Sequence, residues 1–119
     1  MNKRSLIKLI LTAAVLVSGC AVEPQKVVPE PYILGQAAYH NVCANCHGAD
    51  AMGTNKAPGL IHARYSKENF SNKKIAKTIM NGSSSGAMPA QKTKVTQEDI
   101  NQIIKYLRYS QKDIKKANK

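Results

Sequence analysis

Hydrophobic positions along the chain fall into distinct patterns, and each pattern predicts a different kind of element. An apolar run fills residues 9–17, broken only by Thr12. Two later stretches instead show the three- and four-residue spacing of a buried stripe on a helix. The first ends at Gly82, and the second follows a Thr96–Asp99 pair that is similar to a helix-capping box. Their apolar positions are Ile75, Ala76, Ile79 and Met80, and then Ile100, Ile103, Ile104 and Leu107.

The apolar run near the amino terminus indicates an exported protein. Lys3 and Arg4 precede it, and it is shorter than the roughly 20 residues that a helix needs to cross a bilayer. It leads into Val-Ser-Gly-Cys20, which resembles the lipoprotein box of bacterial signal peptides. Residues 1–19 would then be removed, leaving Cys20 as the lipid-modified first residue. The alternatives are an ordinary signal peptide with a chance cysteine, and a short anchor that stays attached.

The remainder of the chain has room for one small domain. Residues 21–32 contain three prolines and no periodicity, which predicts an extended, lipid-anchored tether over residues 20–31. We expect the domain itself over residues 32–111 and a basic tail over residues 112–119. Domains of this size bury only about 60% of their unfolded surface. With five Tyr, one Phe and no Trp, the core is short of aromatic material, so a bound group is expected to complete it.

The charge balance admits several kinds of partner. Eighteen Lys and Arg against seven Asp and Glu give a net charge of +11. This fits a nucleic-acid binder, a protein that meets an acidic partner, or one that lies on an anionic membrane. Composition alone does not separate the three.

The sequence Cys43-Ala44-Asn45-Cys46-His47 carries the most specific chemistry. Cysteines three residues apart share one face of a helical turn, so both sulfurs can reach the vinyl groups of one haem while His47 binds the iron. A thioredoxin-type redox pair would need a βαβ context, which the pattern lacks. A zinc site would need a second ligand pair, for which only His40 and His62 remain, and a disulfide does not favour such close cysteines.

Beyond this motif, residues 32–111 resemble the class I cytochromes c. Gly35, Tyr39 and Cys43 are spaced by four, as are the family's glycine and aromatic residue before the haem cysteine. In the family the last helix crosses the first at this glycine, and Ile103 and Tyr106 fall where that contact is made. The resemblance implies an all-α fold of three to four helices around one covalent haem c, held through Cys43 and Cys46.

The resemblance also suggests the remaining haem contacts. Met88, after a Gly- and Ser-rich loop and before Pro89, is similar to the family's Met-Pro segment that supplies the sixth iron ligand. Pro58 resembles the proline whose carbonyl accepts the Nδ1 proton of the ligating histidine, although a plain turn would look the same; Leu60 is expected to pack on the porphyrin. Among the other candidates, His62 comes second to Met88. The remaining candidates are weaker. Met52 is too close to His47, Met80 belongs to a helical core pattern, and His40 is expected to be a partly exposed helix residue.

Iron with both axial positions filled has no free site for a substrate, which argues for electron transfer and against catalysis. We therefore expect a membrane-tethered carrier between a respiratory donor and acceptor, on the periplasmic face of a bacterial membrane. Ala21 after the lipid cysteine slightly favours the outer membrane in a host with two. The alternatives are a haem c subunit of a larger membrane or periplasmic oxidoreductase complex and, more distantly, a sensor or peroxidase-like protein.

Surface charge points to the partners of such a carrier. A set of lysines is expected to ring the haem and to steer an acidic redox partner, unless it is merely a solvated surface. The tail would touch anionic lipid, and nucleic acid is not an expected partner of an exported haem protein. The ring consists of Lys56, Lys67, Lys73, Lys74, Lys77, Lys92 and Lys94.

Overall fold

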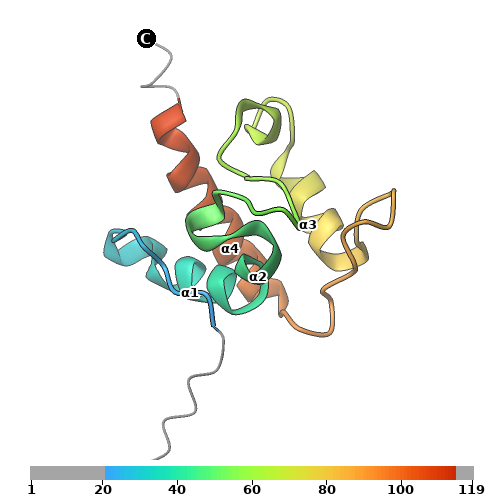
Figure 1. Ribbon diagram of the computed structural model, residues 1–119, viewed down its shortest axis with the longest axis horizontal. Helices are drawn as coiled ribbons and strands as arrows, with labels where there is room; N and C mark the ends of the chain where they lie inside the picture. Colours follow the sequence, from blue (N-terminus) through green and yellow to red (C-terminus); the bar gives the residue numbers. More distant parts are fainter. Residues whose placement is uncertain (1–20, 115–119) are drawn as a thin grey trace, which may run out of the picture.

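The computed structural model describes residues 21–114, and within them it contains helices and no strand (Figure 1). This confirms the expected all-α fold. The α-helices are α1 (Ile33–Val42), α2 (Ala44–His47), α3 (Asn72–Asn81) and α4 (Gln97–Ser110). Short 3₁₀ helices are η1 (Glu30–Tyr32), η2 (Ala49–Ala51), η3 (Ala63–Tyr65) and η4 (Gln111–Asp113). The expected signal segment, Cys20 and the last five residues lie outside the described part.

The crossing of α1 and α4 organises the domain, and Gly35 makes it possible. A Cβ atom at this position would lie 2.1 Å from the Gln102 carbonyl oxygen and 2.7 Å from Tyr106 Cβ. Four residues further along α1, the fully buried Tyr39 ring lies with its centroid 5.5 Å from that of Tyr106. The expected crossing of the first and last helices is therefore present.

The rest of the core forms around this crossing. The predicted stripe on α4 is buried along its whole length, and α3 adds Ile75 and Ile79. As the sequence pattern predicts, α3 ends at Gly82 and α4 begins after Thr96. Ser71 caps α3 by accepting a hydrogen bond from the Lys74 amide. At α4 both bonds of the capping box form, because Thr96 accepts from the Asp99 amide and the Asp99 carboxylate accepts from the Thr96 amide.

The long segment between residues 60 and 72 contains little regular structure and is held by two side chains of the last helical turns. Arg108 donates to the carbonyls of Tyr65 and Phe70 and to the Asn72 side chain. Gln111, which is buried, donates to the Leu60 and Tyr65 carbonyls at 3.0 Å. Burial lowers the pKa of Arg108 from its ordinary value. The segment thus depends on α4 for its position.

Residues 22–28 lie against the domain, whereas the sequence predicted a tether standing clear of it. Val28 is buried, and Val22 packs on the core. The Gln25 amide donates to the Asp50 carboxylate at 3.0 Å, and the Gln36 side chain donates to the Lys26 carbonyl at 2.7 Å. The prolines fix an extended path, as expected, but Val22 and Val28 give that path an apolar side that packs. We call residues 22–28 the strap.

Replacing Gly35 by Ala should destabilise the fold strongly, because the added methyl group meets backbone atoms that cannot move independently. The free energy of unfolding should fall by about 3 kcal/mol, as measured by denaturant unfolding of the haem-loaded protein. The exposed Ala37 on the same helix supplies the control, since Ala37→Ser should change stability by less than about 0.5 kcal/mol. Equal stability of the two variants would contradict the close crossing.

The capping box should contribute stability that depends on pH. Hydrogen bonds from the backbone and side chain of Thr96 lower the pKa of Asp99 below 3.8. Its contribution is therefore present above this value and is lost as the pH falls through the lower pKa of the folded state. Asp99→Asn should be less stable than the parent at neutral pH, and the difference in free energy of unfolding should shrink in acid. A difference independent of pH would contradict the bond.

Candidate haem-attachment site

The two motif cysteines lie on one turn at the junction of α1 and α2. Cys43 is the N-cap of α2, and its carbonyl accepts from the amides of Cys46 at 3.2 Å and His47 at 2.9 Å. Cys43 is half-buried and Cys46 exposed. Burial, with the nearby Cys46, raises the pKa of the Cys43 thiol to about 12. Catalytic redox pairs instead stabilise a thiolate, so this environment argues against a thioredoxin-type role.

His47 is held by the predicted partner. Its Nδ1 atom lies 2.8 Å from the Pro58 carbonyl oxygen, so that nitrogen is the donor and Nε2 is left free as a ligand. The loop between them folds back tightly: the Gly53 amide donates to the His47 carbonyl at 2.7 Å, and the Leu60 amide to the Ala51 carbonyl at 2.8 Å. Such a bond fixes the ring orientation and strengthens the histidine as an iron ligand.

Left-handed backbone conformations give this loop its shape. Gly53 has a φ of 90°, and a Cβ atom there would lie 2.6 Å from the Gly59 nitrogen. Asp50 and Ala51 are also left-handed, with φ values of 54° and 60°, which is uncommon for residues with side chains. Both are buried, so packing and hydrogen bonds hold a conformation that local preference disfavours.

His40 belongs to the support of this loop, not to the surface as the sequence predicted. It is 8% exposed, and both ring nitrogens are engaged. Nδ1 lies 2.8 Å from the Gln36 carbonyl oxygen, and Nε2 accepts from the Asp50 amide at 3.1 Å. The Asp50 carboxylate accepts from the strap at Gln25, while its Oδ1 atom lies 3.7 Å from His40 Nε2. His40 is therefore unavailable to iron.

This linkage of helix, loop and strap was missed by the sequence interpretation. The sequence carried one signal that could have found it. His40 directly follows Tyr39, whose spacing of four from Gly35 and Cys43 places it on the buried face of the first helix. The Tyr39 hydroxyl completes the support by donating to the Gly48 carbonyl at 2.9 Å. Burial raises the pKa of Tyr39, so this hydroxyl stays protonated as a donor.

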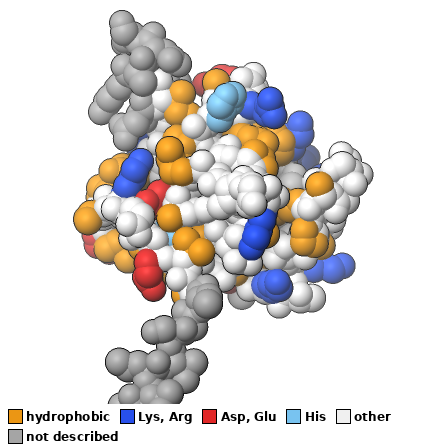
Figure 2. Space-filling model, in the orientation of Figure 1, with side chains coloured by type: hydrophobic (Ala, Val, Ile, Leu, Met, Phe, Trp, Pro, Cys, Tyr) orange, Lys and Arg blue, Asp and Glu red, His pale blue; other side chains and the backbone are white. Residues whose placement is uncertain are grey.

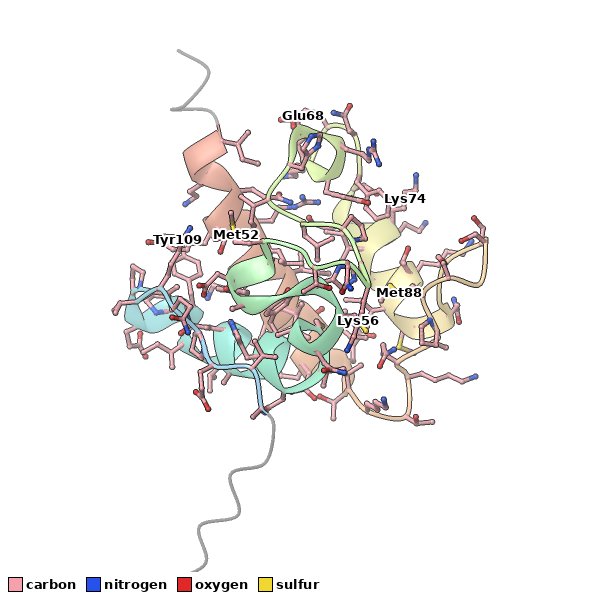
Figure 3. The ribbon with its side chains drawn as sticks, in the orientation of Figure 1. Met52, Lys56, Glu68, Lys74, Met88 and Tyr109 are labelled. Carbon is pink, nitrogen blue, oxygen red and sulfur yellow. The ribbon has the colours of Figure 1, made fainter. Side chains whose placement is uncertain are left out.

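Met88 is presented by a compact loop after α3. Its amide donates to the Ser83 hydroxyl and its carbonyl accepts from the Ser83 amide, both at 2.9 Å. Gly82, with a φ of 82°, brings the chain so close that a Cβ atom would lie 2.6 Å from that carbonyl oxygen. The side chain is half-buried and packs on the core; Figure 3 shows its position.

The other ligand candidates lie in different environments. Met52 is 62% exposed, and Met80 packs against the core from α3, as expected. His62 is exposed and accepts from the Arg64 amide through Nδ1 at 3.1 Å, which leaves its Nε2 free. No group of three or more His, Cys, Asp and Glu side chains suited to a metal ion occurs within residues 21–114. The paired thiols of Cys43 and Cys46, with the oriented imidazole of His47 beside them, are donor groups that suit a covalently attached haem c.

Comparisons with known proteins agree with this geometry. Residues 32–107 match the family described as "Cytochrome C oxidase, cbb3-type, subunit III". A curated relative, the "Cbb3-type cytochrome c oxidase subunit CcoP" of Rubrivivax gelatinosus, is 30% identical over 79 residues; the match covers 66% of this chain and 26% of that protein. The chain thus spans about a quarter of the curated relative's length.

Solved structures give the same fold. The c-type cytochrome XoxG from Methylobacterium extorquens AM1 matches with a TM-score of 0.58 and 25% identity, over 69% of this chain and 51% of that one. The KustC0563 c-type cytochrome matches with a TM-score of 0.56 and 25% identity, over 64% and 95%. Family membership implies haem c as the covalent cofactor, for which Cys43 and Cys46 have the required spacing. The chain belongs to the c-type cytochromes, in the family of cbb3-type oxidase subunit III.

Proposed function

We propose that this protein is an exported electron carrier, lipid-anchored through Cys20, whose haem c is ligated by His47 and Met88. The observation that carries the proposal is the 2.8 Å contact between His47 Nδ1 and the Pro58 carbonyl, beside the two motif cysteines. When bound, haem c supplies a one-electron ferric/ferrous couple. The chain holds that group covalently, orients the histidine and excludes water with the α1–α4 core.

The position of Met88 supports its role as the second axial ligand. A thioether is a soft, neutral ligand that favours ferrous iron and raises the reduction potential. The paired bonds to Ser83 and the close approach at Gly82 fix the loop without using the side chain, so the sulfur remains available. With both axial positions filled by the protein, a substrate has no place on the iron, which is why we propose transfer of electrons and no catalysis.

The charge distribution supports an acidic redox partner. All seven lysines of the expected ring have exposed side chains. Figure 2 shows Lys and Arg gathered toward the right of the visible face, the side on which Figure 3 places Met88 and Lys74. A basic surface near a redox centre raises the rate of encounter with an acidic protein.

A second candidate is a haem c subunit of a larger oxidoreductase complex. It is favoured by the similarity to a cbb3-type oxidase subunit, of which this chain matches only one part. No helix within residues 21–114 has the length and apolar character needed to cross a membrane. Extraction in mild detergent separates the candidates, because a stoichiometric co-purifying partner supports the subunit and a monodisperse monomer supports the carrier.

Met88→Ala should remove the weak near-infrared sulfur-to-iron absorption band of the oxidised protein while leaving the covalent haem spectrum intact. The reduction potential should fall, because the ligand that favours ferrous iron is lost. Met52→Ala, which changes an exposed methionine near the motif, is the matched control and should keep both the band and the potential. Persistence of the band in Met88→Ala would overturn the assignment.

Electron exchange with an acidic partner protein should slow as ionic strength rises, because salt screens the attraction. Lys74→Gln combined with Lys77→Gln should lower the second-order rate constant at low salt and should leave it nearly unchanged at high salt. Stopped-flow measurement at several salt concentrations checks this. Rates that do not depend on salt would contradict steering by the lysines.

A further inference from the structure

Large exposed hydrophobic side chains are concentrated at the start of the domain. The structure exposes four of them strongly within residues 21–114, and three lie between residues 27 and 34. These are Val27 at 98%, Ile33 at 49% and Leu34 at 69%. The fourth, Met52, lies on the loop after the motif. Single exposed apolar residues are normal, but a contiguous group marks a contact surface.

The strap places Val27 in the same part of the molecule as the start of α1. Val28 is buried and the Lys26 carbonyl accepts from Gln36 on α1, so Val27 is fixed beside the first turns of that helix. Ile33 and Leu34 lie on the first turn of α1, which points its Gly35 side at α4. Figure 2 shows hydrophobic side chains along the left edge, where Figure 1 draws η1 and the beginning of α1.

Tyrosines and lysines continue this surface onto α4. Tyr32 and Tyr109 stack with ring centroids 4.2 Å apart. Lys105 Nζ lies 5.8 Å from the Tyr32 ring centroid, and Lys112 Nζ lies 5.7 Å from that of Tyr109. We call the whole set the anchor-side surface: Val27, Tyr32, Ile33, Leu34, Lys105, Tyr109 and Lys112.

We propose that the anchor-side surface rests on the lipid bilayer. Its composition suits an anionic interface: apolar side chains enter the acyl boundary, tyrosines lie at the headgroups, and lysines reach the phosphates. The neighbouring Glu23, Glu30 and Glu68 are exposed and oppose this attraction. Lys26, Lys105 and Lys112 outnumber them together with Lys67 and Lys73, two lysines of the expected ring that line the same hollow as Tyr32 and Tyr109.

The path of the chain favours lipid over a partner protein. The proposal rests on the lipid anchor at Cys20 proposed above, and the strap is already bonded to the domain at Gln25. Five residues of extended chain reach at most about 17 Å, so the domain would lie close to the bilayer. Figure 1 shows the described chain starting at the bottom of the view, and Figure 3 places Tyr109 at the left and Met88 at the right. Tyr109 and Met88 thus lie on different sides of the molecule in this view.

Spin labelling of the lipidated, haem-loaded protein tests the contact. Leu34→Cys offers one free thiol once Cys43 and Cys46 carry haem and Cys20 carries lipid. On phosphatidylcholine vesicles containing phosphatidylglycerol, the nitroxide should become accessible to oxygen and shielded from a water-soluble nickel complex. Lys74→Cys, exposed on the opposite side in Figure 3, is the control and should stay accessible to nickel. Equal nickel accessibility at both positions would overturn the proposal.

A pair of substitutions gives a second measurement. Ile33→Ser combined with Leu34→Ser should raise the rate at which the holoprotein transfers between vesicles by roughly tenfold, because apolar contact with the acyl boundary is lost. Met52→Ser removes a similarly exposed side chain outside the surface and should leave the rate unchanged. Unchanged reduction potential and absorption spectrum verify the fold of each variant. Equal transfer rates for all three proteins would contradict the contact.

Mass spectrometry of the mature amino terminus separates this inference from the proposed function. An acylated Cys20 with a water-exposed label at residue 34 would overturn the surface and keep the anchor. An unmodified terminus with a shielded label would overturn the anchor and keep the surface. If the label is exposed when the purified protein is bound to lipid vesicles but shielded in native membranes, a partner protein covers the surface, and contact with lipid is refuted.

Discussion

The approach of α1 to α4 at Gly35 is the constraint on which the rest of the structure depends. The absence of a side chain lets the backbones of the two helices touch, and the rings of Tyr39 and Tyr106, tilted against each other, fill the space beside that contact. Cys43 follows Tyr39 by one helical turn, so the crossing also sets where the haem-attachment motif begins. A small fold with few aromatic residues thus uses one backbone contact to place its cofactor chemistry.

A second set of contacts connects α1 to the loop after the motif and fixes the position of that loop. His40 and Tyr39, neighbours on α1, bond to Asp50 and Gly48 on that loop. The loop in turn presents the Pro58 carbonyl to His47. Each step is a hydrogen bond between a side chain and a backbone atom. The two buried bonds, made by Tyr39 and His40, explain how left-handed Asp50 and Ala51 are tolerated. The orientation of His47 therefore depends on side chains that never touch it.

The sequence predicted those parts of the fold that repeat a periodic or spaced pattern. The stripe and capping box of α4, the end of α3 at Gly82, the glycine crossing and the Cys-X-X-Cys-His turn all follow from local spacing, and the structure has each of them. The packing of the strap and the burial of His40 could not be predicted in this way. Both depend on Asp50, which bonds to Gln25 in the strap and to His40 on α1. No periodic pattern in the sequence connects these residues. Arg108 and Gln111 were missed for the same reason, because their partners are carbonyls of an irregular segment.

The order of α1 and α4 along the chain affects when their contact can form during folding. The buried face of α1 is completed only by α4, the last α-helix of the described chain, so this contact closes a loop of some seventy residues. Until that closure, Cys43 and Cys46 stand in a segment without its tertiary partner, and their thiols are open to covalent modification. Once α4 is in place, Cys43 becomes half-buried. The topology thus makes Cys43 more accessible to haem attachment before the final helix packs than after it, while Cys46 stays exposed.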